Sequence, residues 1–555
     1  MKKSYYITTP IYYVNAAPHL GTSYTSVLGD VQARYRRSMG QDVLFLTGVD
    51  EHGEKVAQAA AEHNMQPQAW CDLLKDRFIE MGDLLHISND DFIRTTEPRH
   101  IHAVQHFWDV LKEQGYIYKG DYSGWYCVPE ETFFTETQVR HAQESAHANG
   151  LQEVGSDVKT ETGSPLCPDC GRPLERVSEQ SWFFKLSAFE DALLAYYEAH
   201  PHFIEPETRR NEVISFVKEG LKDLSVSRST FNWGIELPFD TSHVTYVWFD
   251  ALINYLTAAG YGADNDEFAY RWPAQVHLVG KDIIRFHCVI WPAMLMAAGI
   301  EPPQEIFAHG FLTVKNDESG AGEKMSKSKG NVISPDQVID LLGVDGYRYY
   351  FMSDVAPGSD GAISFERMRQ VYNADLANSW GNLVSRTISM SMKYFEGMTP
   401  SFGENKQNED AAWALRDNPL KTMAKSLIDP YCKSMESFAY DKALAKVMDL
   451  VHRANSYIEE SEPWTLAKDA QTHAELVNVI ADLLETIRIC AYLLMPVMPM
   501  SSQEVLRRLS IKNIPDTAHP ANNIPTLVEL MQWGQLSFGA PLIKGEALFP
   551  RLEHP

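Results

Sequence analysis

The stretch YYITTPIYYVNAAPHLGTSYTS, residues 5–26, predicts a strand, a turn and the start of a helix. Its aromatic and β-branched run ends in Asn, Ala, Pro and Gly, and apolar residues with helical spacing follow from near Ser23 through Val27, Val31 and Tyr35. DVLFLTGVDEHGEKVAQAAAEH, residues 42–63, repeats this order. Strands that alternate with helices predict a parallel sheet, with ligands bound at the carboxyl ends of its strands.

The rest of the chain extends this plan. Residues 116–180 interrupt it with glycines, a polar run and CPDCGRPL, and strand-to-helix units return at 244–256 and 274–295. After residue 366 the apolar spacing is helical. We therefore predict an α/β fold: a Rossmann-like parallel-sheet catalytic domain, split by a connective insertion and followed by an all-helical bundle. The predicted boundaries are 1–115 and 238–320 for the two sheet halves, 116–237 for the insertion, 321–365 for a lysine-rich loop region, 366–530 for the bundle and 531–555 for a tail.

Composition narrows the class of protein. The chain has 555 residues, a formal net charge of −25 and seven cysteines. This charge argues against general nucleic-acid affinity, which depends on neutralising phosphates. Scattered cysteines, odd in number, indicate a reducing compartment instead of a disulfide framework. Thr8, Thr9 and Pro10 break the first apolar run, so we expect no secretory signal, no membrane partner and a cytoplasmic enzyme.

The segment KMSKSKGN, residues 324–331, carries the clearest chemical signal. Lys324, Lys327 and Lys329 lie among small polar residues with glycines nearby, as in a mobile loop that offers charge to a polyanion such as triphosphate. A solvated basic loop is the simpler interpretation of the charge pattern alone. The order of motifs along the chain favours the first interpretation, since HLG follows the first predicted strand and KMSKS follows the last.

This pair resembles the HIGH and KMSKS signatures of class I aminoacyl-tRNA synthetases. The methionyl-tRNA synthetases are the most similar family, over essentially the whole chain. The resemblance is carried by TTPIYYVNAAPHLG, FLTGVDEHG, CPDCGRPL, RNEV, VTYVWFDALINY, GKDIIRFH, IWPAML, KMSKSKGN, GNLVSR and EPW. Leucyl, isoleucyl and valyl relatives resemble the chain less, because a separate editing domain enlarges their insertion. The resemblance implies a methionine–tRNA ligase that uses ATP with Mg²⁺, L-methionine, and initiator and elongator methionine tRNAs.

For the amino acid, the resemblance implies an aromatic pocket with a carboxylate for the ammonium. A thioether suits polarizable aromatic surroundings. Asp50 would hold the α-ammonium, and Asp282 would contact the substrate or the adenylate. The pocket residues implied are Ile11, Tyr13, Trp248, Ala251, Tyr255, Phe286, His287 and Trp291. For single residues the alternative stays open that Trp291, or the spaced set Trp248, Ala251 and Tyr255, is ordinary core, and that His287 is a buried, hydrogen-bonded histidine.

For ATP, the resemblance implies contacts at the first strand–helix turn and at two later strand ends. The residues are His19, Gly21, Thr22, Gly280, Asp282, His309, Leu312 and Lys327, with Lys324 also at the phosphates. Catalysis by His19, Lys324 and Lys327 would consist of positioning and charge stabilisation. Thr22 stands where the family usually has a second histidine. A hydroxyl donates one neutral hydrogen bond, so we expect a weaker phosphate contact there.

Two further sites are implied. Cys127, Glu130, Cys167 and Cys170 match a zinc knuckle in which one cysteine is replaced, so the alternatives are a structural Zn²⁺ or a vestigial knuckle with free thiols. Asn382, Arg386, Pro463 and Trp464 are the implied anticodon contacts; Asn382 and Arg386 share a helix face, and Trp464 offers a stacking platform.

Two other functions are compatible with parts of this sequence. A tRNA-binding paralogue without activity is supported only by Thr22. A class I synthetase of other specificity, chiefly cysteinyl, is disfavoured because the thiols lie in the insertion. We expect a monomer, since an appended oligomerising domain of some relatives does not follow Pro555. One methyl distinguishes homocysteine from methionine, so we also expect some release of homocysteine as thiolactone.

Overall fold

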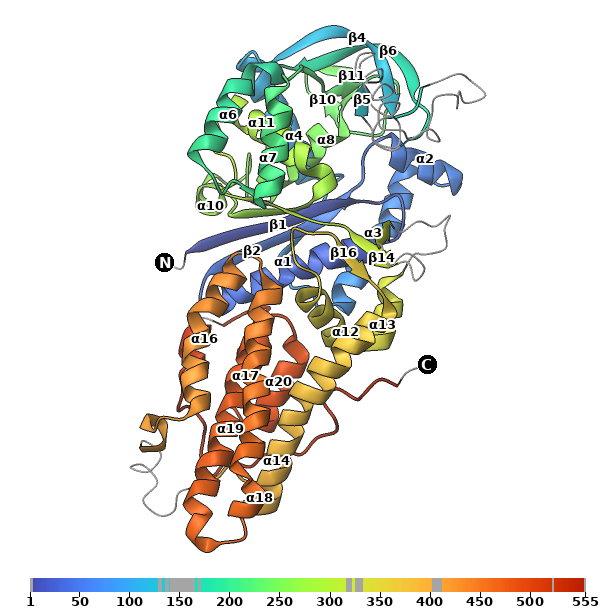
Figure 1. Ribbon diagram of the computed structural model, residues 1–555. Helices are drawn as coiled ribbons and strands as arrows, with labels where there is room; N and C mark the ends of the chain where they lie inside the picture. The colour runs from blue at the N-terminus through green and yellow to red at the C-terminus, as the bar shows by residue number, and fades with distance from the viewer. Residues whose placement is uncertain are drawn as a thin grey trace.

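In the computed structural model, a parallel sheet lies between an upper lobe and a lower helical bundle (Figure 1). The structure describes residues 3–127, 132–134, 139, 165–167, 171–315, 322–324, 333–401, 412–521 and 524–553. No helix within these ranges is long and apolar enough to cross a membrane.

The central sheet has six parallel strands in the order β3-β2-β1-β12-β13-β7. Their bounds are β1 Ser4–Tyr13, β2 Asp42–Asp50, β3 Asp91–Arg94, β7 Ile204–Glu205, β12 Val276–Gly280 and β13 Ile306–His309. The strand order reverses at β1, which pairs with β2 on one side and β12 on the other. Ligands bind at such a reversal in open parallel sheets. The predicted α/β class is thus confirmed.

The chain regions between the sheet strands form helices and smaller sheets. Between β1 and β7 lie α1 Leu20–Ser38, α2 Glu54–Glu62, α3 Pro67–Leu84, α4 Pro98–Glu113 and α6 Glu190–Ala199. Between β7 and β13 lie α7 Glu207–Lys218, α8 Val247–Ala251, α9 Asn254–Ala258, α10 Asn265–Arg271 and α11 Trp291–Ala297, with a 3-10 turn at Lys281–Ile283 and a π-helical turn at Phe286–Ile290. A 3-10 turn at Leu186–Phe189 precedes α6.

The predicted insertion forms an antiparallel sheet in the order β5-β4-β6-β8. Its strands are β4 Ile117–Cys127, β5 Thr132–Phe134, β6 Glu175–Phe184 and β8 Leu224–Ser225. A three-stranded sheet of β9 Ser227–Arg228, β10 Glu236–Leu237 and β11 Asp240–Thr245 adjoins it. β7 also arises within residues 116–237, yet it pairs with β13 at the edge of the central sheet.

The lysine-rich region begins with another small sheet. It contains β14 Leu312–Lys315, β15 Gly322–Lys324 and β16 Gly361–Ile363, with α12 Pro335–Ser353 between the last two strands. Ser334 caps α12 in a reciprocal capping box with Gln337. Residues 325–332, most of the KMSKSKGN segment, lie outside the described ranges.

The remaining chain is helical, as predicted; no named strand follows β16 in the ranges that the structure covers. The helices are α13 Phe365–Val371, a π-helical segment Tyr372–Gly381, α14 Asn382–Tyr394, α16 Pro419–Glu436, α17 Tyr440–Ser461, α18 Pro463–Leu466, a 3-10 turn Ala470–Thr472, α19 His473–Leu494, α20 Pro499–Arg508 and α21 Leu527–Leu530. The tail returns along the bundle, since Thr399 N donates to Ala540 O at 2.8 Å and Leu552 N donates to Asn373 Oδ1 at 2.9 Å.

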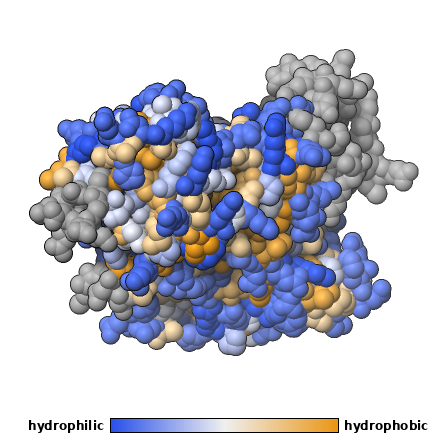
Figure 2. Space-filling model, turned by 90° about the horizontal axis from the view of Figure 1, so that it is seen from below, coloured by the Kyte–Doolittle hydropathy of each residue, from blue (hydrophilic) through white to orange (hydrophobic). Residues whose placement is uncertain are grey.

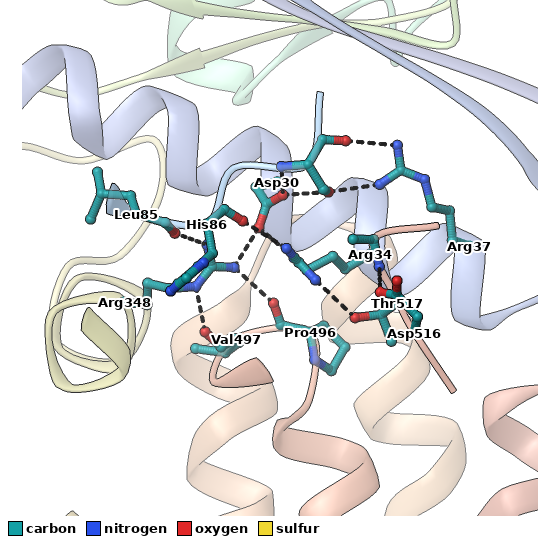
Figure 3. Close-up of polar contacts among 12 residues, drawn as sticks. Asp30, Arg34, Arg37, Leu85, His86, Arg348, Pro496, Val497, Asp516 and Thr517 are labelled. Atoms are coloured by element: carbon teal, nitrogen blue, oxygen red, sulfur yellow. Dashed lines mark hydrogen bonds and ion pairs between the residues drawn. The ribbon is translucent and has the colours of Figure 1, made fainter. Parts of the chain in front are cut away.

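A buried ionic cluster joins the bundle to the sheet domain (Figure 3). Arg348 of α12 donates to Asp30 of α1 at 2.6 Å, and Arg34 donates to the same carboxylate oxygen at 2.7 Å. Arg348 also donates to the carbonyl oxygens of Val497 at 2.7 Å and Leu85 at 3.0 Å. Burial opposes ionisation of Asp30, but the two guanidinium groups outweigh it and hold the pKa of this carboxyl well below its ordinary value. The cluster therefore fixes α1 against the turn that follows α19.

Candidate active site

The N-terminus of α1 lies beside the carboxyl end of β1. The helix begins at Leu20, three residues before the predicted start, because His19 caps it. Thr22 N donates to His19 Nδ1 at 3.2 Å, so Nδ1 is an acceptor and the proton of the neutral ring is on Nε2. His19 is exposed at this helix N-terminus, the end of a helix at which anions bind.

Thr22 itself contributes mainly through its backbone. Its side chain is buried, and its Oγ1 lies 3.5 Å from His19 Nδ1, longer than the backbone contact. A Cβ on Gly21 would lie 3.0 Å from His19 Cε1, so the glycine leaves the room in which the imidazole sits. The turn thus holds one imidazole where the usual family pattern has two.

Two predicted ATP residues from the other half of the sheet lie together. Gly280 and His309 are register partners at the ends of β12 and β13. Thr25 Oγ1 of α1 lies 2.8 Å from His309 Nε2, which connects the ends of these strands to the helix. Burial is the main cause of the lowered pKa of His309, and the Gly310 carbonyl, 2.9 Å from Nδ1, opposes it. A neutral histidine therefore lies between the helix and the strand ends.

Gly280 lies close to the Asp282 side chain. A Cβ there would lie 2.4 Å from Asp282 Oδ1. Asp282 is exposed in the 3-10 turn that follows β12, and Leu312 is buried at the start of β14. The backbone of Lys324 pairs with Thr313 across β14 and β15, whereas Lys327 lies outside the described residues.

Aromatic residues of β1, α8 and the π-helical turn after β12 form a second group. Trp248 stacks on Phe286 with ring centroids 3.9 Å apart, and Tyr13 meets Trp248 edge-on at 6.2 Å. These three side chains are half-buried, whereas Ala251, Tyr255 and His287 are buried. Ile11 of β1 is half-buried as well. The predicted residues thus form an aromatic rim of half-buried rings and a floor of buried side chains.

Hydrogen bonds define the protonation state of the floor. His287 Nδ1 lies 3.0 Å from Ile283 O, which only accepts, so Nδ1 carries the proton. His287 Nε2 then accepts from Tyr255 Oη at 2.8 Å. Burial lowers the pKa of His287 to about 4, against a smaller opposite effect of the Ile283 carbonyl. The floor is therefore uncharged at neutral pH.

His277 of β12 also belongs to this group. Its ring stacks on Tyr255 at 4.2 Å, and Trp291 Nε1 donates to its Nε2 at 3.3 Å. Trp291 is fully buried behind these two rings. A histidine within the apolar strand VHLVG gave no pattern that could have singled it out.

Asp50 lies at the carboxyl end of β2. It is the last residue of β2, in register with Tyr13 of β1, and its side chain is 3% exposed. A carboxylate therefore lies next to the aromatic rim, on the side of the sheet reversal opposite to Gly280 and His309.

Comparisons with known proteins show which family the chain resembles. The model for class I tRNA synthetases (M) matches residues 5–388, and that for the anticodon binding domain of methionyl tRNA ligase matches residues 408–552. The methionine–tRNA ligase of Caldanaerobacter subterraneus is 45% identical over 554 residues, 100% of this chain and 80% of that protein. That of Bacillus subtilis is 43% identical over 552 residues, 99% of this chain and 78% of that protein.

A solved structure shows the same relationship. Mycobacterium tuberculosis methionyl-tRNA synthetase in complex with methionyl-adenylate superposes with a TM-score of 0.86 at 41% identity, and the match covers 99% of this chain and 100% of that one. The chain belongs to the methionyl-tRNA synthetase family. The methionine–tRNA ligases are aminoacyl-tRNA ligases, so the predicted family, fold class and enzyme class are confirmed, and the cysteinyl alternative is removed.

The family model for the anticodon binding domain matches residues 408–552, which include most of the helical bundle. Arg386 of α14 donates to Glu459 of α17 at 2.7 Å, and Trp464 of α18 is 37% exposed. Asn382 is half-buried and Pro463 buried, at the starts of α14 and α18. Figure 1 draws α14 and α18 at the far end of the bundle, and Figure 2, seen from that end, shows apolar patches within a mainly hydrophilic face.

The knuckle is partly described. Cys127 and Cys167 are buried in one cluster with Val139 and Leu174. Gly171, with φ of 72°, closes a tight turn by donating to Cys167 O at 2.9 Å. Glu130 and Cys170 lie outside the described residues. Within the described part of the chain, no group of three or more His, Cys, Asp or Glu residues is arranged to hold a metal ion.

Proposed function

We propose that the site at the sheet reversal activates L-methionine with ATP and then passes it to methionine tRNA. The observation that carries this proposal is the pairing of an uncharged aromatic group beside Asp50 with the exposed imidazole of His19 at the N-terminus of α1. One side suits a thioether and an ammonium, and the other suits phosphate.

In the first step the methionine carboxylate attacks the α-phosphorus of ATP and pyrophosphate leaves. Asp50 binds the ammonium, and His19 Nε2–H donates to phosphate oxygens together with Lys324 and Lys327. A donor aimed at developing charge is worth about 3 kcal/mol. Mg²⁺ bound to the ATP phosphates would neutralise further charge. In the second step a ribose hydroxyl at the tRNA 3′ end takes the aminoacyl group and AMP leaves.

The uncharged floor supports selection of methionine. His287 and Tyr255 satisfy each other's hydrogen-bonding groups, so an apolar side chain leaves none of this pair unpaired. A charged side chain would lose its hydration here without gaining a counter-ion. Leucine and isoleucine lack the polarizable sulfur and differ in shape, which gives smaller discrimination.

Methionine-dependent exchange of pyrophosphate into ATP tests the first step. We expect exchange with the native chain and its collapse in Lys327→Ala, because that substitution removes a cation from the phosphates. Stimulation by another amino acid would refute the pocket assignment. Measurable tRNA affinity without any exchange would favour the tRNA-binding paralogue.

For tRNA recognition we propose that Asn382, Arg386, Pro463 and Trp464 contact the anticodon. The exposed Trp464 offers a stacking surface, worth about 1–3 kcal/mol per base. Trp464→Ala should therefore lower kcat/KM for tRNA charging while methionine-dependent exchange stays unchanged. An equal loss of activity in tRNA charging and in pyrophosphate exchange would contradict a role of Trp464 in anticodon binding.

For the knuckle we propose a structural Zn²⁺ held by Cys127, Glu130, Cys167 and Cys170. The two described thiols are buried in one cluster beside the tight turn at Gly171, which supports a tetrahedral thiolate-rich site. Metal analysis of the purified chain tests this directly, and less than about 0.1 equivalents of zinc would exclude it. We further propose a cytoplasmic monomer, which light scattering after size exclusion checks for oligomeric state.

A further inference from the structure

A buried polar cluster next to the site has no role in the reaction as described. It consists of His52, Asp250 and His100, with exposed fractions of 5%, 0% and 0%. His52 Nδ1 lies 2.7 Å from one oxygen of Asp250, and His100 Nε2 lies 2.7 Å from the other. Both carboxylate oxygens are thus occupied, each by a different imidazole.

The cluster connects three parts of the chain that are remote in sequence. His52 lies in the turn between β2 and α2, two residues after Asp50. Asp250 lies in α8, between Trp248 and Ala251 of the proposed pocket. His100 lies in the first turn of α4. The turn that carries the carboxylate and the helix that carries the aromatic rim therefore meet at one side chain.

The protonation state of Asp250 determines which group donates in each hydrogen bond of the cluster. Burial would raise the pKa of Asp250, but His52 and His100 outweigh it, and the pKa lies below its ordinary value. The carboxylate is therefore ionised and only accepts, so each imidazole must present N–H to it. Both rings are held at defined angles to α8 by these bonds.

The same turn has other supports that do not involve α8. Glu51 accepts from Arg94 Nε at 2.7 Å, which joins the turn to β3. Trp233 Nε1 donates to Glu51 O at 2.6 Å, and Gly53 N donates to Trp233 O at 3.2 Å. Arg94 bonds the Glu51 side chain and joins the turn to β3, whereas Asp250 joins the turn to α8, which carries Trp248 of the aromatic rim. A substitution of Arg94 therefore serves as a matched control, because it removes one contact of the turn and leaves the contact between the turn and α8 in place.

We propose that Asp250 is a positioning residue that sets the distance between Asp50 and the aromatic rim, and thereby the affinity for the methionine ammonium. The proposal rests on the proposed function, because it takes Asp50 as the ammonium site. Asp250 acts through His52; His100 anchors the opposite oxygen to α4.

The test uses Asp250→Asn, His52→Ala, His52→Asn and the comparison Arg94→Met in pyrophosphate exchange, with methionine and ATP titrated separately. An Asn amide can present its N–H near the place of His Nδ1. We expect Asp250→Asn and His52→Ala to raise KM for methionine about tenfold or more while KM for ATP stays within about twofold. His52→Asn should regain most of the affinity, and Arg94→Met should not separate the two KM values.

If the cluster only stabilises the fold, the KM values of the variants follow a different pattern. KM for methionine and for ATP would then rise together, or His52→Asn would be as impaired as His52→Ala, and either result overturns the proposal. If Asp250→Asn does not fold, the two His52 variants decide alone. If the native chain shows no methionine-dependent exchange, the proposed function fails, and calorimetric binding of methionine by the same variants still tests the positioning role.

Discussion

At Thr22 the group that meets His19 is the backbone N–H, which donates to Nδ1 at 3.2 Å. We therefore expect Thr22→Ala to slow pyrophosphate exchange by no more than about tenfold, the upper range for one neutral hydrogen bond. His19→Ala should slow it about 100- to 1,000-fold, since a donor to the developing charge is lost. His19→Asn is the control: Asn keeps the helix cap but not the Nε2 donor, so its stability should be near native and its exchange low. A large loss in Thr22→Ala would show that the hydroxyl itself acts.

His287 gives the pocket a pH dependence at the same scale. Its pKa falls from 6.5 to about 4 on burial, so the unfolded chain binds a proton that the native state does not. The stability contribution is therefore complete above pH 6.5 and is lost as the pH falls toward 4, by about 1.4 kcal/mol per unit. When the free energy of unfolding from urea titrations at pH 5, 6 and 7 is plotted against pH, its slope should be shallower for His287→Gln than for the native chain. Equal slopes would contradict a buried neutral imidazole.

Among the elements, the link between β13 and β14 depends on Gly310. A Cβ there would lie 2.2 Å from the backbone carbon of Ser359, next to the loop whose Asp360 accepts from Phe311 N at 2.9 Å. Gly310→Ala should cost about 1–3 kcal/mol of stability and raise KM for ATP, because His309 precedes this position. Gly82→Ala in α3 is the control: its Cβ would have only Ile87 Cβ nearby, at 4.0 Å, and it should gain about 1 kcal/mol. Unchanged stability in Gly310→Ala would show that the loop yields freely.

Across the whole molecule, the Asp30–Arg348 cluster of Figure 3 holds the bundle to the sheet domain. Arg348→Met leaves a buried carboxylate with Arg34 as its remaining cation, and we expect a loss of about 3–5 kcal/mol in the free energy of unfolding. The double variant Asp30→Asn, Arg348→Met should lose less free energy of unfolding than the two single variants together, by at least about 1 kcal/mol. Simple additivity in denaturant titrations would contradict direct coupling.

The same cluster makes the stability of the protein depend on pH in the acid range. The pKa of Asp30 is below its ordinary value of 3.8 in the native state, so its stabilisation is present above pH 3.8 and is lost as the pH falls below that value. Thermal unfolding between pH 3 and 5 should show this loss in the native chain and a smaller one in Asp30→Asn.

Local patterns predicted much of this architecture. The strand–turn–helix order at residues 5–26 and 42–63 predicted a parallel sheet, and the structure confirms that β1 and β2 pair in parallel, with Tyr13 and Asp50 in register at their ends. The start of α1 was misplaced to Ser23, because histidine is not among the preferred N-cap residues. β7 has two residues, too few to show a period, and its pairing depends on a distant partner.

Contacts between distant residues were the part that no pattern predicted. Asp250 meets His52 and His100 across 198 and 150 residues of chain, and His277 meets Trp291 from within an apolar strand. Burial and hydrogen-bond partners decide their roles, and neither follows from spacing along the sequence.

Charging of methionine tRNA by the full chain tests the central claim most directly. With ATP and labelled methionine, we expect methionyl-tRNA to form, and kcat/KM to fall by about 100-fold or more when the methionine anticodon is replaced, as for a site that reads unstacked bases. Formation of another aminoacyl-tRNA, or charging that ignores the anticodon, would contradict the assignment of the pocket and of the bundle.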